Sequence, residues 1–140
     1  DVYKRQDLRR ALETEIAAQA AAQRSKRDLT AIDNALAAIS QAVENGGDGV
    51  KEDVAFHRSI ARATGNPYFL TTLAFVSQFL EAATRVTRGN EARHADLMRA
   101  VLQEHQAIVD AIRRQDVEGA REAARVHMVN AAKRLRQAHR

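Results

Sequence analysis

The sequence predicts an all-α fold, an antiparallel bundle of about six helices. Its 140 residues are rich in Ala, Arg, Leu and Glu and include one proline and six glycines, a composition that favours helix throughout. Apolar residues also recur at helical spacing in each predicted segment. The chain has the length of one domain with a sizeable core, and we expect residues 1–140 to form it.

The first two predicted helices are amphipathic segments of the usual kind. The first covers about 6–24, and the second begins near Asp28, a good N-cap residue, and stops at "NGGDG" in 45–49. Residues spaced four apart mark the core stripe of the first helix, and they are Leu8, Leu12, Ile16 and Ala20.

The third and fourth predicted helices, at 49–64 and 67 to about 87, are separated by the sequence "TGNP". Gly65 suits a left-handed position after the third helix, Asn66 suits the N-cap of the fourth, and Pro67 suits its first turn. The apolar side chains expected inside the fourth helix are Phe69, Leu70, Leu73, Val76, Phe79 and Leu80.

The last two predicted helices form a hairpin. After a loop "TRGNEARH" at 87–94, the fifth helix covers about 91–114, and Asp116 caps the sixth. Each helix carries a histidine in an otherwise apolar stripe, His105 in the fifth and His127 in the sixth.

The spacing of these histidines predicts that they face each other. They are 22 residues apart with Asp116 at their midpoint, so at ~1.5 Å rise per residue each lies about 16 Å from the turn. Asp53 and His57 lie one turn apart on a third helix. Three imidazoles and one carboxylate together make a plausible site for Zn²⁺, Ni²⁺ or Mn²⁺.

Each residue taken alone has a simpler interpretation. A single core histidine is more often hydrogen-bonded packing than a metal ligand, and Asp53 could be a first-turn residue favoured by the helix dipole. The joint occurrence on three helices favours metal. His94 lies 11 residues before His105, and His139 lies in the basic tail, so we expect neither in the cluster.

The charge and composition narrow the choice of partners. The net charge of +4 is a mild excess, and the basic run "KRLRQAHR" at 133–140 suits a helix C-terminus better than a phosphate-binding patch. The chain has no cysteine for a disulfide or thiolate metal site, and no apolar run approaches the ~20 residues of a membrane span. We therefore expect a soluble, cytoplasmic protein without membrane contact.

Four motifs carry a resemblance to a known family: "DLRRALETEIAAQAA", "DVAFHRSIARATGNPYF", "EHQAIVDAIRRQDVEGA" and "ARVHM". Over about 7–135 the chain resembles the FCD effector-binding domain that follows a winged helix-turn-helix in FadR-type GntR transcription regulators. The resemblance implies a helical bundle with a central cavity, a small organic acid as effector and a homodimer. It also implies a divalent metal ion on the cavity floor, with the ligands Asp53, His57, His105 and His127.

The same resemblance implies two effector contacts. Arg9 stands in the "R-x-x-L-E" context of the first helix, and Asn66 stands in "GNP"; the alternatives are a solvated arginine and a helix cap. No winged helix precedes "DVYKRQ", so we expect a fragment or an isolated effector domain that reaches DNA only through a missing N-terminal domain.

The sequence supports a non-enzymatic metabolite sensor as the first hypothesis. The alternatives are a metal-dependent hydrolase on a helical bundle and a helical dimerisation module with satisfied core histidines. A hydrolase needs a general base beside a metal-bound water. Glu104 points about 100° away from His105 on its helix, and the sequence offers no clear inward carboxylate beyond Asp53.

Overall fold

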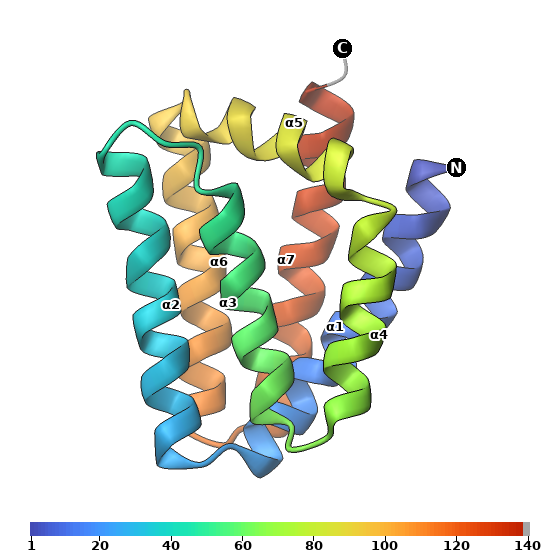
Figure 1. Ribbon diagram of the computed structural model, residues 1–140, viewed down its shortest axis with the longest axis vertical. Coiled ribbons are helices and arrows are strands. Elements are labelled where there is room, and N and C mark those ends of the chain that lie inside the picture. The colour runs from blue at the N-terminus through green and yellow to red at the C-terminus, as the bar shows by residue number, and fades with distance from the viewer. Residues whose placement is uncertain (139–140) are drawn as a thin grey trace.

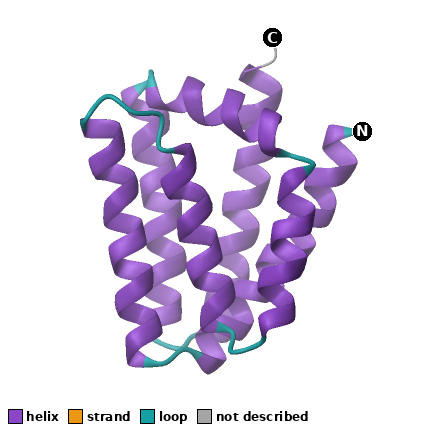
Figure 2. Ribbon diagram, viewed as in Figure 1, coloured by secondary structure: helices purple, strands orange, loops and turns teal. Residues whose placement is uncertain are grey.

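The computed structural model describes residues 1–138, which form seven α-helices and no strand (Figures 1 and 2). His139 lies outside this range. No helix within it is long and apolar enough to cross a membrane. The helices are α1 (Val2–Gln23), α2 (Lys26–Glu44), α3 (Val50–Ala63), α4 (Pro67–Gln78), α5 (Glu81–Ala92), α6 (Ala95–Arg113) and α7 (Val117–Ala138).

The helices other than α5 run along the long axis of the molecule, and α5 lies across one end of the bundle (Figure 1). The first helix, α1, packs most extensively against the last, α7, and α2 packs against α3. Small residues on α1 allow this close approach, since Ala17, Ala20 and Ala21 are buried. The largest apolar side chains at the centre are Ile16, Ile32, Phe56, Ile108 and Ile112.

The helix boundaries follow the local capping chemistry. Gly65 has φ +71°, and the Asn66 side chain accepts a hydrogen bond from the Tyr68 backbone N–H at the start of α4, as "TGNP" predicts. Asp116 likewise accepts a hydrogen bond from the Gly119 N–H at the start of α7.

The predicted start of the second helix was wrong. Ser25 is the N-cap of α2, and it forms a capping box in which Asp28 is the third helical residue. The reciprocal bonds between these two side chains and backbone N–H groups place the start of the helix three residues earlier than Asp28 alone suggests.

The predicted fourth helix is in fact two helices. The chain bends at Phe79–Leu80, and α5 then includes most of the segment "TRGNEARH" that we expected to be a loop. The bend buries Leu80 but leaves Phe79 48% exposed. Leu8, placed in the core stripe of the first helix, is also exposed, at 58%.

Candidate functional site

Three histidines converge at the centre of the bundle. His57 on α3, His105 on α6 and His127 on α7 are all buried, and each offers one ring nitrogen within 4.8 Å of the others. The Nε2 atoms of His105 and His127 are 3.2 Å apart, so the two helices of the hairpin bring these rings to one level as their spacing predicts.

Asp53 completes the cluster from one turn before His57. Its Oδ1 atom lies 3.5 Å from His57 Nε2 and 3.4 Å from His105 Nε2. Within residues 1–138, neither oxygen of Asp53 nor Nε2 of His57 has a hydrogen-bond partner, although both residues are buried. Buried polar atoms without partners are costly, so a group that binds Asp53 Oδ1 and His57 Nε2 would be stabilising here.

The separations suit a metal ion as that group. Ligands about 2.1 Å from a common metal lie about 3.0 Å apart in octahedral geometry and about 3.4 Å apart in tetrahedral geometry. The separations of 3.2 and 3.4 Å fall within this range and that of 3.5 Å lies just above it. Imidazole nitrogen together with one carboxylate oxygen is a donor set for Zn²⁺, Ni²⁺ or Mn²⁺.

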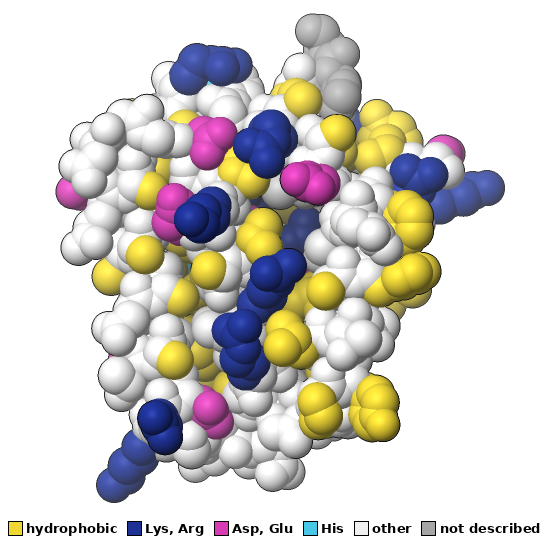
Figure 3. Space-filling model, viewed as in Figure 1, with side chains coloured by type: hydrophobic (Ala, Val, Ile, Leu, Met, Phe, Trp, Pro, Cys, Tyr) yellow, Lys and Arg dark blue, Asp and Glu magenta, His cyan; other side chains and the backbone are white. Residues whose placement is uncertain are grey.

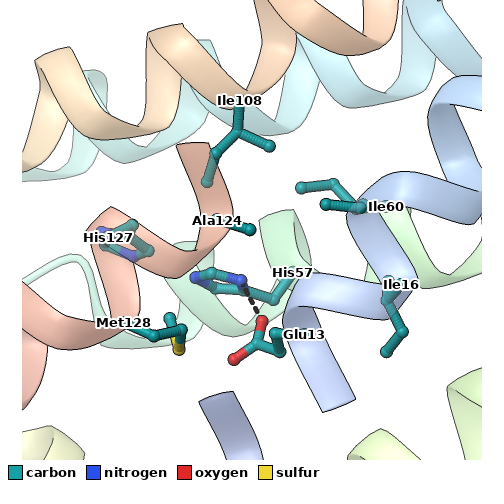
Figure 4. Close-up of a pocket in the computed structure, with 9 residues that line it drawn as sticks. Glu13, Ile16, His57, Ile60, Ile108, Ala124, His127 and Met128 are labelled. Atoms are coloured by element: carbon teal, nitrogen blue, oxygen red, sulfur yellow. Dashed lines mark ion pairs between the residues drawn. The ribbon is translucent and has the colours of Figure 1, made fainter. Parts of the chain in front are cut away.

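Two carboxylates orient the histidines from behind. His57 Nδ1 lies 2.5 Å from Glu13 Oε1 on α1 (Figure 4), and His127 Nδ1 lies 2.7 Å from Glu104 Oε1 on α6. In each pair the carboxylate holds a proton on Nδ1 and so directs Nε2 toward the centre of the cluster, as in many histidine–metal sites.

Sequence reasoning missed both of these carboxylates. Glu104 does diverge from His105 on its own helix, but it points toward α7 and contacts His127 there. Glu13 is only 5% exposed, and the sequence pattern includes it only as the last residue of the "R-x-x-L-E" context of Arg9. Its position four residues after Arg9, on a helix whose neighbouring stripe is apolar, is the one signal that could have found it.

The protonation states follow from burial and from these charges. Burial alone would lower the pKa of His57, but Glu13 and Asp53 outweigh it and raise that pKa to about 9. Burial lowers the pKa of His127 to about 4, against the opposing effect of Glu104, and burial holds the pKa of His105 well below its usual value. At neutral pH, His105 and His127 are therefore neutral.

A small cavity adjoins the histidines on the α1 side (Figure 4). Its volume is about 10 Å³, which is room for about one water molecule. Glu13, His57 and His127 supply its polar wall, and the remaining lining is Ile16, Ala17, Ile60, Ile108, Ala124 and Met128.

A much larger groove of about 720 Å³ opens between α3, α4 and α5 and reaches His57 and Arg9. Among the described residues, its lining includes five basic and two acidic side chains. Figure 3 shows Lys and Arg side chains along a hollow in this face. The charged lining residues are Arg9, Lys51, Arg58, Arg62, Arg85, Asp48 and Glu81.

The structure separates the two residues that the resemblance implies for the effector. Arg9 lines the groove, and its Nε–H donates to Glu13 Oε2 at 2.5 Å, so it lies at the groove end nearest the histidines. Asn66 is an exposed cap, nine residues after His57 and therefore about 13 Å further along the helix axis. His94 is exposed at the start of α6, outside the cluster.

Comparisons with known proteins agree on one family. The family model described as "FCD domain" matches residues 6–130. The HTH-type transcriptional repressor NanR of Escherichia coli strain K12 is 33% identical over 123 residues, which are 88% of this chain and 46% of the repressor. NanR of Klebsiella aerogenes is 29% identical over 123 residues, which are again 88% of this chain and 46% of the repressor. The chain thus spans about half the length of these relatives.

A solved structure supports the fold independently. The chain titled "Streptococcus agalactiae GntR" superposes with a TM-score of 0.77 over 94% of this chain and 58% of that one. At 23% sequence identity, this likeness concerns the fold alone.

Proposed function

Since the chain belongs to the FCD domain family, we propose that it is the effector-sensing part of a GntR-type transcription regulator. In this proposal it binds a small carboxylate metabolite through a divalent metal ion. The observation that carries the proposal is the convergence of Asp53, His57, His105 and His127, whose inward atoms lie 3.2–3.5 Å from their neighbours. Among these inward atoms, Asp53 Oδ1 and His57 Nε2 are buried without a hydrogen-bond partner in residues 1–138.

The chain's own residues would hold the metal through three Nε2 atoms and Asp53 Oδ1. Glu13 and Glu104 keep the protons of two rings on Nδ1. The metal supplies a compact positive charge, and a five- or six-coordinate ion would keep one or two positions for a carboxylate oxygen. Zn²⁺, Ni²⁺ and Mn²⁺ all suit this donor set.

The groove would supply the path and the remaining contacts for the effector. Lys51, Arg58 and Arg62 line it and form no ion pair with any residue in 1–138. A cleft lined by one sign of charge raises the local concentration of the opposite sign. Arg9 lies at its inner end, where it can form a charge-assisted pair with a carboxylate.

The proposal extends to the rest of the regulator only through the relatives. Two of them are named as HTH-type transcriptional repressors, and this chain covers 46% of each. We propose that the full-length protein is cytoplasmic, forms a homodimer and binds DNA through an N-terminal winged helix. The proposed role is regulatory rather than catalytic, because Glu13 and Glu104 already bind histidine nitrogens and are poorly placed to act as a general base.

The effector is expected to need the metal. Calorimetry of sugar acids and hydroxy acids should detect binding to metal-loaded protein, and removal of the metal should weaken that binding at least about tenfold, since one bond to a charged group contributes about 1.5–3 kcal/mol. Equal affinity for the metal-loaded and chelated proteins would refute the metal-anchored mechanism.

Charge reversal in the groove is expected to weaken effector binding. The double variant Arg58→Glu/Arg62→Glu should lower the affinity about tenfold at low salt and less at high salt, because exposed charges act through screened attraction. The matched control is Arg27→Glu, an exposed arginine on α2 away from the groove. A similar loss in the control, or none in the double variant, would show that the groove charges do not guide the effector. Arg9→Ala, tested with the same acids, reports on the inner contact.

A further inference from the structure

The buried side of α5 is polar. Between Glu81 and Ala92 its buried residues are Thr87, Arg88 and Glu91, while Val86 is 45% exposed. A helix on a bundle normally packs through an apolar stripe. What holds α5 across the end of this bundle (Figure 1) must therefore be largely ionic.

A chain of ion pairs connects α5 to the histidine cluster from two directions. Its six members have side chains at most 10% exposed. We call it the ionic chain, and in order its members are Asp53, Arg88, Glu91, Arg134, Glu104 and His127.

The first half of the ionic chain joins α3 to α5. Arg88 Nε lies 3.2 Å from Asp53 Oδ2, and the same guanidinium binds Glu91 through Nη1. Asp53 thus turns one oxygen toward Arg88 and the other toward His57 and His105.

The second half returns from α5 to α7. Glu91 Oε2 lies 3.0 Å from Arg134 Nε. Arg134 binds Glu104 through two parallel hydrogen bonds of 2.7 and 2.9 Å, and Glu104 holds His127. Both ends of the ionic chain are therefore proposed metal ligands.

We propose that Arg88 is a positioning residue through which metal binding orders α5. This inference rests on the proposed function, because a metal ion that binds Asp53 Oδ1 and His127 Nε2 would immobilise both ends of the ionic chain. Three carboxylates and two guanidiniums leave the ionic chain one negative charge, which a metal ion would compensate in place of the proton that it displaces from His57. Ordering at α5 and metal affinity then strengthen each other by linkage.

The contacts of α5 show what its ordering would affect. Its outer residues Glu81, Thr84 and Arg85 form a wall of the effector groove. At the bend before α5, the Phe79 carbonyl accepts a hydrogen bond of 3.3 Å from Arg5 on the first turns of α1. Metal binding would thereby stiffen one wall of the groove and the N-terminal end of α1 together.

Amide hydrogen exchange of the whole chain with and without Zn²⁺ tests this inference. In the parent, Zn²⁺ should slow exchange in residues 81–92 by at least about tenfold more than in α2, which has no member of the ionic chain and reports on global stabilisation. Arg88→Met should still bind Zn²⁺, with affinity about 10–100-fold lower, but its α5 should follow α2.

A second variant, which keeps the net charge of the ionic chain, separates the loss of Arg88 from misfolding caused by an unpaired buried charge. Arg88→Met/Glu91→Met removes one charge of each sign, a change that buried ion pairs often tolerate, and it should also lose the selective response of α5. Selective protection of α5 that persists in both variants, or that is missing from a parent shown by calorimetry to bind Zn²⁺, would overturn this inference alone. A parent that binds no Zn²⁺ would overturn the proposed function as well.

Discussion

Replacing His105 or His127 with alanine is expected to lower the affinity for Zn²⁺ or Ni²⁺ by at least about 100-fold. Each change removes a direct ligand, whereas loss of a group that only orients a ligand costs about 10–100-fold. Helix content should remain near that of the parent, because the apolar side chains that pack the helices together, such as Ile16, Ile108 and Ile112, are unchanged. Metal titration followed by calorimetry, with circular dichroism of each variant, measures both quantities.

The matched control for these variants is His94→Ala. His94 is exposed, and its Nδ1 lies 2.7 Å from the Asn90 carbonyl, so its loss should leave metal affinity unchanged. Parent-like binding in both core variants would show that the metal, if bound, lies elsewhere. A loss in His94→Ala equal to theirs would show that the effect is not specific to the cluster.

The stabilisation by metal is expected to increase strongly with pH between 6 and 9. Metal binding to His57 Nε2 must displace a proton, because the pKa of His57 is raised to about 9 by Glu13 and Asp53 against the effect of burial. Release of one proton makes the affinity rise about tenfold per pH unit, or about 1.4 kcal/mol. The difference in Tm between Ni²⁺-loaded and chelated protein at pH 6, 7, 8 and 9 measures it.

The metal-free protein should respond to pH in the opposite sense over that range. The pKa of His57 is about 9 in the folded protein and about 6.5 in the unfolded chain. Protonated His57 therefore stabilises the fold below pH ~6.5, and this stabilisation is lost as the pH rises toward 9. The pKa of His127 is lowered to about 4 in the folded protein. Neutral His127 is therefore accommodated without cost above pH ~6.5, and the fold loses stability as the pH falls from there toward 4. Together, these two histidines predict that the free energy of unfolding of the metal-free protein is greatest at pH ~6.5.

The two pH profiles give clear outcomes. Excess metal at 100 times its Kd adds about 2.7 kcal/mol, or roughly 6–11 °C for a domain of this size. A difference in Tm that is constant from pH 6 to 9 would show that no proton leaves the site on metal binding. No difference at any pH would contradict the metal site itself.

Much of the bundle could be predicted because its helices bury apolar stripes and end at recognisable caps. The hairpin at Asp116 is an example: it predicts that His105 and His127 meet, and their Nε2 atoms are 3.2 Å apart. Such inferences need only the helical repeat and one turn. The fold class and the family resemblance are confirmed by the helices and by the family match.

The parts that could not be predicted depend on pairing between distant charges. Arg88 and Glu91 lie in a segment whose polarity and Gly89 indicate a loop, yet they are buried because Asp53 and Arg134 compensate them. The sequence around Phe79 contains no proline or glycine that would predict the bend. Periodicity describes the faces of one helix and carries no information about which charge on another helix will meet them.

The close packing of α1 against α7 also bears on how the protein is made. A ribosome adds about 5–20 residues per second, so roughly 5–20 s pass between the end of α1 at Gln23 and the start of α7 at Val117. During that time the nascent chain must keep the apolar side of α1, including Ile16, from associating with other chains. His127 lies on α7, so the nascent chain completes its histidine cluster only after α7 has been synthesised.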